Sequence, residues 1–117
     1  MTAYDAHPLT WDEFLRVEMR VGTVLSADRN PIARKPAFVL KIDLGPSLGV
    51  RTSSAQLVAR HDVADLVGRQ VICVVNFPAK HVAGVRSEVL VLAATPSETE
   101  AVVIRPDQVV PNGVRIA

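Results

Sequence analysis

The stretch AFVLKIDLGPSLGVRTSSA, residues 37–55, decides the fold of this chain. Apolar side chains occupy every second position of residues 37–44, at Phe38, Leu40, Ile42 and Leu44. This period of two predicts a strand with one buried face. The next segment, GPSLG at 45–49, predicts a turn. Residues 50–55 are then expected to form a second strand that returns beside the first.

A short helix and a strand are expected before this hairpin. Thr10 and Glu13 have the spacing of a capping box, which predicts a helix over residues 11–16. Apolar residues alternate with charged ones from residue 17, so one strand is predicted over residues 17–27 with an interruption at Gly22. A loop over 28–36, punctuated by two prolines, leads from this strand into the hairpin.

A second short helix and two more strands are expected after the hairpin. Asp62 and Gly68 are residue types that begin and end a short helix. Two apolar strands are expected over residues 70–76 and 85–93. A polar loop over 95–100, a short strand over 101–105 and a tail over 106–117 follow them.

The order of these elements predicts the fold class. Three strands, a short helix and two strands are the layout of a five-stranded OB-fold, an all-β barrel with short helices. A parallel sheet would need a longer helix after most strands, and the gaps between these strands are too short for one. We expect one domain over residues 1–117, with a barrel core at about 17–93 and N- and C-terminal extensions at 1–16 and 94–117.

Composition favours a globular protein of the cytoplasm. The chain has 117 residues, of which 49% are hydrophobic, and no run approaches the roughly 20 apolar residues of a membrane-spanning helix. Its first residues lack the basic-then-apolar order of a signal peptide. Cys73 is the single cysteine, so a buried thiol is expected. A hydrophobic content this high in a small domain also indicates self-association, most often as a two-fold dimer.

The basic residues are concentrated in the middle of the chain. Residues 29–86 hold nine basic and three acidic residues. Residues 1–28 hold two basic and five acidic residues, and residues 87–117 hold two basic and four acidic residues. The formal net charge is only +1. A local excess of this kind attracts polyanions even when the whole chain is close to neutral.

Sequence motifs give no support to an enzyme, a metal site or a cofactor. There is no Gly-rich phosphate loop and no Cys/His spacing typical of a metal site. His7, His61 and His81 lie in or beside predicted loops, where a solvated histidine is more common than a catalytic base. Ser53 and Ser54 lack the glycines of a nucleophile elbow. A non-catalytic protein is therefore expected.

Candidate binding residues fall in two predicted loops. Arg34 and Lys35 lie in the first loop, and Lys80 and Arg86 lie between the last two barrel strands. Loops of this fold commonly bind polymers, so these cations predict contacts to phosphate groups that weaken with salt. The alternative is that each is an ordinary solvated charge.

The few aromatic residues limit the kind of ligand. Phe14 and Phe38 are expected in the core, whereas Phe77 either stacks on a base or apolar side chain or packs under its loop. A general single-strand binder would carry more aromatic residues, so a folded RNA recognised by shape, or a different ligand, is favoured. Glu88 is expected to fix the loop by pairing with Arg86 or Lys80; alternatively it accepts a hydrogen bond from a base or a peptide N–H.

Several motifs, in order along the chain, resemble the CsaA-type family of small bacterial chaperones with a tRNA-binding domain. They are RVGTV at 20–24, ARKPA at 33–37, IDLG at 42–45, SSAQ at 53–56, VVNFP at 74–78, GVRSEVLVL at 84–92 and PDQVVPNG at 106–113. The SSAQ segment separates this branch from the related domain appended to methionyl-tRNA synthetases, where a Ser-Gly-Leu-type sequence is expected.

The resemblance implies a non-catalytic OB-fold homodimer whose N- and C-terminal extensions help to form the interface. It implies binding of tRNA or other structured RNA, without membrane insertion. It also implies a chaperone role toward unfolded or pre-secretory polypeptides, for which Met19, Phe77 and Val82 are expected to line an apolar pocket. The alternative is a purely RNA-binding module with no chaperone role.

The resemblance also implies a set of site residues. The binding-surface motifs of the family fall on Ser53, Ser54, Gln56, Asn76, Lys80, Arg86, Ser87 and Glu88, with Arg34 and Lys35 in its basic loop. His61 and Ala93 depart from the family pattern, which has tyrosine and glycine there. His81 stands where a second basic residue is common, so Lys80 and Arg86 are expected to supply most of the phosphate contact from their loop.

Overall fold

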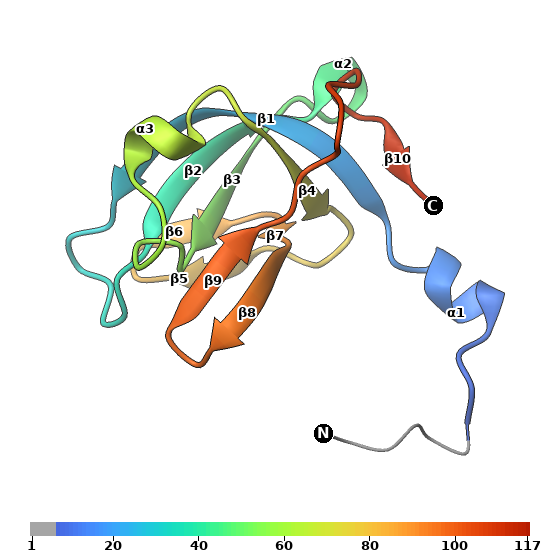
Figure 1. Ribbon diagram of the computed structural model, residues 1–117, viewed down its shortest axis with the longest axis horizontal. Coiled ribbons are helices and arrows are strands. Elements are labelled where there is room, and N and C mark those ends of the chain that lie inside the picture. The colour runs from blue at the N-terminus through green and yellow to red at the C-terminus, as the bar shows by residue number, and fades with distance from the viewer. Residues whose placement is uncertain (1–6) are drawn as a thin grey trace.

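Six strands form a curled antiparallel sheet in the computed structural model, which describes residues 7–117 (Figure 1). Five of them follow one another across the sheet, and the sixth, β10 (Arg115–Ile116), pairs with β1. The spatial order of the strands is β3-β2-β1-β4-β7. Their bounds are Met19–Arg29 for β1, Phe38–Asp43 for β2, Val50–Ala55 for β3, Gln70–Val74 for β4 and Leu90–Val91 for β7. The predicted all-β barrel with short helices is confirmed.

The central strand, β1, bends so that it pairs with two neighbours in turn. Its first half pairs with β4 as far as Thr23, and its second half pairs with β2. The predicted interruption at Gly22 is wrong, because the strand continues through it; the register shifts between Val24 and Ser26 instead. A Cβ at Gly22 would lie 2.6 Å from Cγ2 of Ile42, so this glycine serves close packing of β2 against β1.

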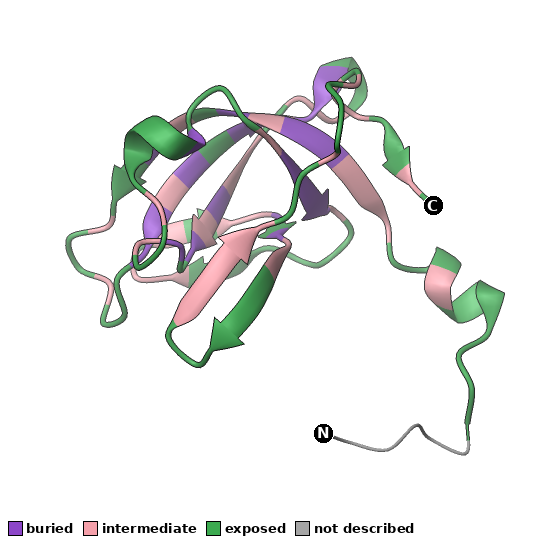
Figure 2. Ribbon diagram, viewed as in Figure 1, coloured by how far each residue is buried: buried purple, intermediate pink, exposed green. Residues whose placement is uncertain are grey.

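The core lies inside the curled sheet. All four alternating apolar residues of the predicted strand, Phe38, Leu40, Ile42 and Leu44, are buried. Figure 2 shows buried segments on β1, β2 and β4. Helix α3, Val63–Leu66, begins at the predicted cap Asp62 and buries Leu66 against this core. Burial raises the pKa of the Cys73 thiol to about 12. That thiol is therefore a packing group, as predicted.

Two hairpins extend from the barrel where the sequence predicted irregular structure or a single strand. They pair β5, Lys80–Val82, with β6, Val85–Ser87, and β8, Ala93–Ser97, with β9, Glu100–Val103. The single strand predicted over 85–93 is wrong, because Glu88 leaves the ladder to bond β3. The predicted polar loop over 95–100 is also wrong, since both of its ends lie in the second hairpin.

The turn between β5 and β6 requires an unusual backbone conformation. Ala83 has φ of 46° and Gly84 has φ of 79°, which is the two-residue turn whose twist matches that of paired strands. An alanine in this conformation is uncommon, because its Cβ crowds the backbone. The surrounding strands hold it there.

The first helix, α1, stands away from the barrel. It spans Trp11–Leu15, has the predicted capping box at Thr10, and has no buried residue. The expectation that Phe14 lies in the core is wrong: its ring is half-buried and meets Trp11 edge to face at 6.2 Å. In the described part of the chain, no helix is long and apolar enough to cross a bilayer.

The C-terminal tail closes one end of the barrel. It ends in β10, Arg115–Ile116, which pairs with the start of β1. Gln70 donates to the Val110 carbonyl at 2.6 Å and to Asn112 Oδ1 at 3.1 Å. The turn predicted over residues 45–49 is instead a short helix, α2, over Gly45–Leu48. A Cβ at Gly45 would lie 2.5 Å from the Asn112 carbonyl oxygen. The tail is thus locked against the barrel by close backbone packing.

Candidate functional site

A groove of about 660 Å³ runs between β3 and the β5–β6 hairpin. Predicted site residues from three separate segments line it, namely Ser54, Gln56, Phe77, Lys80, Ser87 and Glu88. The remaining lining residues are Pro78, Ala79, Val82, Val89 and Leu90. The fold therefore brings the SSAQ segment and the 76–92 stretch together on one surface, which we call the β3 groove.

One wall of the β3 groove is held to β3 by side chains. Ser54 N–H donates to Ser87 Oγ at 3.0 Å, and Thr52 N–H donates to Glu88 Oε1 at 3.1 Å. The Glu88 N–H donates to the Thr52 carbonyl at 2.7 Å. The second carboxylate oxygen of Glu88 accepts from Arg86 at 3.2 Å, so the predicted pairing of these two residues is confirmed. These bonds join β3 to residues 87–88, at the end of the β5–β6 hairpin.

The other wall of the groove is apolar. Phe77 is 58% exposed and Leu90 is 48% exposed, although both lie against the groove. The alternative in which Phe77 packs under its loop is thereby excluded. Exposed aromatic and aliphatic surface in a concavity is suited to a nucleic-acid base or an apolar side chain. Val82 lies here as predicted, whereas Met19 is on β1, where it pairs with β4 and β10.

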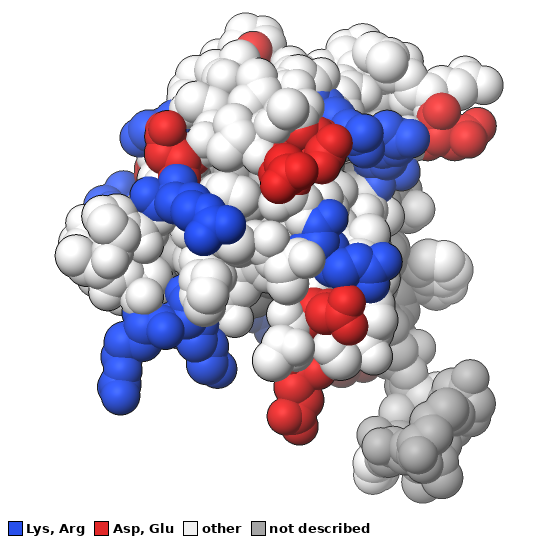
Figure 3. Space-filling model, turned by 60° about the vertical axis from the view of Figure 1, so that its left-hand side comes forward, with Lys and Arg blue, Asp and Glu red and all other residues white. Residues whose placement is uncertain are grey.

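The two basic loops meet beside the groove. Asn30 donates to the Ala83 carbonyl at 3.1 Å, which fixes the segment after β1 against the turn of the β5–β6 hairpin. Arg34 and Lys35 are exposed in that segment, and Lys80 is exposed on the hairpin. Figure 3 shows Lys and Arg side chains projecting freely into solvent from one face of the molecule. A polyanion can therefore contact both loops at once.

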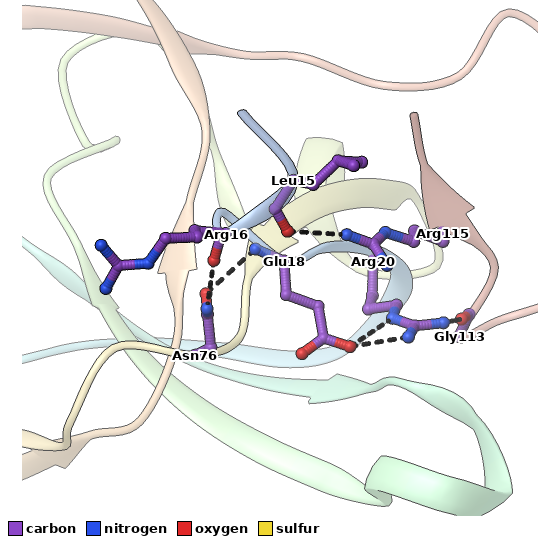
Figure 4. A network of polar contacts seen from close by, with 7 residues as sticks. All are labelled: Leu15, Arg16, Glu18, Arg20, Asn76, Gly113 and Arg115. Carbon is purple, nitrogen blue, oxygen red and sulfur yellow. Dashed lines mark hydrogen bonds and ion pairs between the residues drawn. The ribbon is translucent and has the colours of Figure 1, made fainter. Parts of the chain in front are cut away.

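Asn76 and Ser53 occupy places outside the groove lining. Asn76 donates to the Arg16 carbonyl at 2.6 Å and accepts from the Glu18 N–H at 3.0 Å, which anchors α1 to the barrel (Figure 4). Ser53 is 1% exposed and faces the barrel interior, where its Oγ has no hydrogen-bond partner among the described residues. A ligand in the groove does not reach the Ser53 side chain.

Charged groups around α1 complete the network in Figure 4. Arg20 contacts Glu18 at 2.6 Å and donates to the Gly113 carbonyl at 3.1 Å. The hydrogen bond from Arg20 holds the pKa of the Glu18 carboxyl below its ordinary value. Arg115 donates to the Leu15 carbonyl at 3.0 Å. The two extensions are thus tied to each other and to β1.

An exposed apolar surface lies at these extensions. A hollow of about 430 Å³ is lined by Leu9, Thr10, Trp11, Phe14 and Ala117. Trp11 is 78% exposed and Leu9 is 70% exposed. We call this the terminal surface. Large apolar side chains grouped in this way are typical of a protein interface.

The side chains that line the site are suited to binding, since they combine apolar surface with hydrogen-bonding and basic groups. Within residues 7–117 there is no group of three or more His, Cys, Asp or Glu residues that could hold a metal ion. Sequence reasoning missed Pro78, Ala79, Val89 and Leu90 as lining residues. These residues lie in short apolar segments, in which no hydrophobic period marks the side chains that line a groove.

Comparisons with known proteins agree with this picture. A profile of the tRNA binding domain family matches residues 19–115. The crystal structure of chaperone CsaA from Bacillus anthracis str. Ames has a TM-score of 0.89 and 43% identity, over 95% of this chain and 100% of that chain. The CsaA chaperone protein from Picrophilus torridus has a TM-score of 0.85 and 36% identity, over 94% of this chain and 100% of that chain.

Curated relatives include a much longer enzyme. The methionine–tRNA ligase of Flavobacterium johnsoniae is 30% identical over 108 residues, which are 92% of this chain and 15% of the ligase. The chain spans about 15% of the length of that relative. What the two share is a binding domain rather than a catalytic one. From the profile match and the OB-like structures, the chain belongs to the tRNA binding domain family and is of the CsaA type within it.

Proposed function

We propose that this protein is a non-catalytic, homodimeric tRNA-binding protein of the cytoplasm that also acts as a chaperone for unfolded or exported polypeptides. The observation that carries the proposal is the β3 groove, with an apolar wall and two basic loops beside it. A tRNA-binding domain supports the RNA partner. The chaperone names of two similar structures support the polypeptide partner.

For RNA, the exposed cations supply affinity. Arg34, Lys35, Lys80 and Arg86 are exposed on two segments that Asn30 ties together, so all four are available to a phosphate backbone. Phosphate contacts give binding without sequence recognition and make it strongly salt-dependent. Phe77 is the aromatic residue in the groove lining, which favours a folded RNA recognised by shape over a single strand held by stacking.

For polypeptides, the groove supplies an apolar surface of suitable size. Its volume of about 660 Å³ lies within the range of ordinary ligand pockets. Phe77, Val82 and Leu90 give it an apolar wall on which side chains of an unfolded segment can lie. Gln56 and Lys80 add exposed polar groups at the edge of the groove.

For the dimer, we propose that residues 1–16 and 94–117 flank a barrel core at about 17–93 and form the interface between copies of this single domain. The terminal surface supports this, because Trp11 and Leu9 are largely exposed. A two-fold dimer would cover the same patch on both copies. It would also present two β3 grooves to one RNA, which raises affinity through effective concentration.

The proposal is tested with the double variant Lys80→Ala, Arg86→Ala. We expect the variant to fold and to bind tRNA more weakly in a filter-binding titration; protection of an unfolded protein from aggregation equal to that by the wild type would show that RNA and polypeptide use separate surfaces. Absence of wild-type tRNA binding at low salt would contradict the RNA role. Absence of wild-type protection against aggregation would leave the alternative, a tRNA-binding module with no chaperone role, which the family match favours.

A further inference from the structure

Part of the β3 edge inside the groove is open. The N–H groups of Thr52 and Ser54 point away from β2, toward Glu88 and Ser87. Backbone groups alternate between the two edges of a strand, so the Ser54 carbonyl also points away from β2. Ala55, the last residue of β3, pairs with Phe38, and its carbonyl points opposite to the Gln56 N–H across their trans peptide, so this N–H points away from β2 too. Among the residues that the structure describes, neither group has a hydrogen-bond partner. Ser54 and Gln56 both line the β3 groove.

The two open groups match the backbone of one residue in an added strand. In parallel pairing, one residue donates its N–H and accepts with its carbonyl across two neighbouring residues that lie two positions apart. The Ser54 carbonyl accepts and the Gln56 N–H donates, and Ala55 lies between them. The part of the β3 edge before the Ser54 carbonyl is already bonded. There, Ser87 Oγ and the Glu88 carboxylate accept from the Ser54 and Thr52 N–H groups, as the carbonyls of a neighbouring strand would. An added strand therefore has one defined starting point.

We propose that the β3 groove binds an extended polypeptide segment by adding it to the edge of β3, through the Ser54 carbonyl and the Gln56 N–H. The inference rests on the proposed chaperone function and specifies how that function recognises its substrates. Main-chain hydrogen bonds give affinity whatever the sequence, and pockets for alternate side chains give a preference. A protein that binds many unfolded chains needs recognition of this kind.

The surroundings of the open edge select the side chains of the segment. Successive side chains of an extended segment point to opposite faces, so every second one can lie on the apolar wall formed by Phe77, Val82 and Leu90. Lys80 is exposed on the groove and Arg34 and Lys35 are exposed beside it, which favours an acidic residue in the segment. The expected ligand is thus an extended segment of apolar residues with an acidic neighbour.

Phosphate groups of RNA do not match the open edge. The Ser54 carbonyl needs a hydrogen-bond donor, and an ionised phosphate has only acceptors. A phosphate can accept from the Gln56 N–H but cannot pair with the Ser54 carbonyl, so RNA matches only half of the open edge and is expected to bind through the cations of the basic loops instead.

The variant pair Gln56→Pro and Gln56→Ala tests the proposal. Proline removes the N–H at position 56, and no hydrogen bond of the described chain depends on that N–H. Alanine removes the side chain and keeps the N–H, so it is the matched control. The probe is fluorescently labelled, reduced and carboxymethylated α-lactalbumin, which stays unfolded. We expect Gln56→Pro to bind it about three- to ten-fold more weakly than Gln56→Ala does, because only the proline variant loses a backbone hydrogen bond to the segment.

The outcomes separate this proposal from the proposed function. Equal binding by the proline and alanine variants would overturn strand addition and leave the chaperone role intact. No binding by the wild type would overturn both. A tRNA affinity that falls in Gln56→Pro as much as the polypeptide affinity does would also overturn strand addition, because the groove would then be distorted or used by RNA.

Amide exchange in the unmodified protein gives a second measurement that does not depend on a variant. The exchange of the Gln56 amide, followed by NMR, is expected to slow when the unfolded polypeptide is added and to stay unchanged when tRNA is added. An unchanged Gln56 rate in the presence of bound polypeptide would overturn the proposal.

Discussion

At the scale of single residues, Glu88 connects the site to the barrel. Its carboxylate accepts from the Thr52 N–H and from Arg86, and its own N–H bonds the Thr52 carbonyl. Arg86 is 62% exposed in this pair, so the pair contributes little to stability but reduces the charge that Arg86 offers to an anion. Lys80, which makes no ion pair among the described residues, is then the stronger cation of the hairpin.

Two substitutions of Glu88 separate its roles. Glu88→Ala leaves the partly buried Thr52 N–H without its acceptor, so we expect the free energy of unfolding to fall by about 1–3 kcal/mol. Glu88→Gln keeps an acceptor oxygen and removes the negative charge, so it should be nearly as stable as the wild type and bind tRNA more tightly. Urea denaturation and tRNA titration measure the two effects. Equal stability of the two variants would contradict the role of the Thr52 bond.

At the scale of elements, the alternation in β2 and the cap of α3 could be predicted because both are local patterns. The division of residues 85–93 into separate strands could not, since it depends on Glu88 turning to β3, which is distant in sequence. The β5–β6 hairpin was also not predicted, because Gly84 and the nearby Pro78 are residue types typical of a loop. In both places tertiary contacts decide the local structure.

The site shows the same limit. The SSAQ segment and the 76–92 stretch were predicted as binding motifs, and their meeting in one groove follows from the barrel. The contacts of Asn76 could not be predicted, since they require residues 16–18, which connect α1 to β1, to pass beside the end of β4. The open edge of β3 was hidden too, because it depends on where Ser87 stops covering that strand.

Asn76→Ala tests the link between α1 and the barrel. The variant loses the bonds to the Arg16 carbonyl and the Glu18 N–H, so we expect a loss of about 1 kcal/mol in the free energy of unfolding. We also expect weaker self-association, because α1 carries much of the terminal surface. Sedimentation across a concentration series measures this. A variant that associates as tightly as the wild type would show that the position of α1 is not needed for the interface.

At the scale of the whole molecule, the groove and the extensions lie next to each other. Phe77 lines the β3 groove and also a second hollow that includes Glu13, Arg16 and Val17 near α1. Figure 1 shows α1 on a single connection at one side of the barrel, where a second copy can reach it. Dimer formation through the extensions would therefore bring the partner close to each groove.

Trp11→Glu tests this arrangement. A charge at a residue that is 78% exposed should leave the fold intact and break the proposed apolar interface, so we expect a monomer by sedimentation. The affinity for tRNA should fall with it, since two linked grooves bind one RNA more tightly than one does. Leu25→Glu is the matched control, because Leu25 is 49% exposed on β1, outside the terminal surface. A dimeric Trp11→Glu variant would contradict the proposed interface.

The central claim is that the basic loops beside the β3 groove bind the phosphate backbone of tRNA. The most direct measurement is the slope of the logarithm of tRNA affinity against the logarithm of salt concentration, for the wild type and for Lys80→Ala. We expect a steep wild-type slope that becomes shallower by about one in Lys80→Ala, with Arg105→Ala, an exposed residue outside the groove, as the unchanged control. The same slope in the wild type and in Lys80→Ala would contradict the claim.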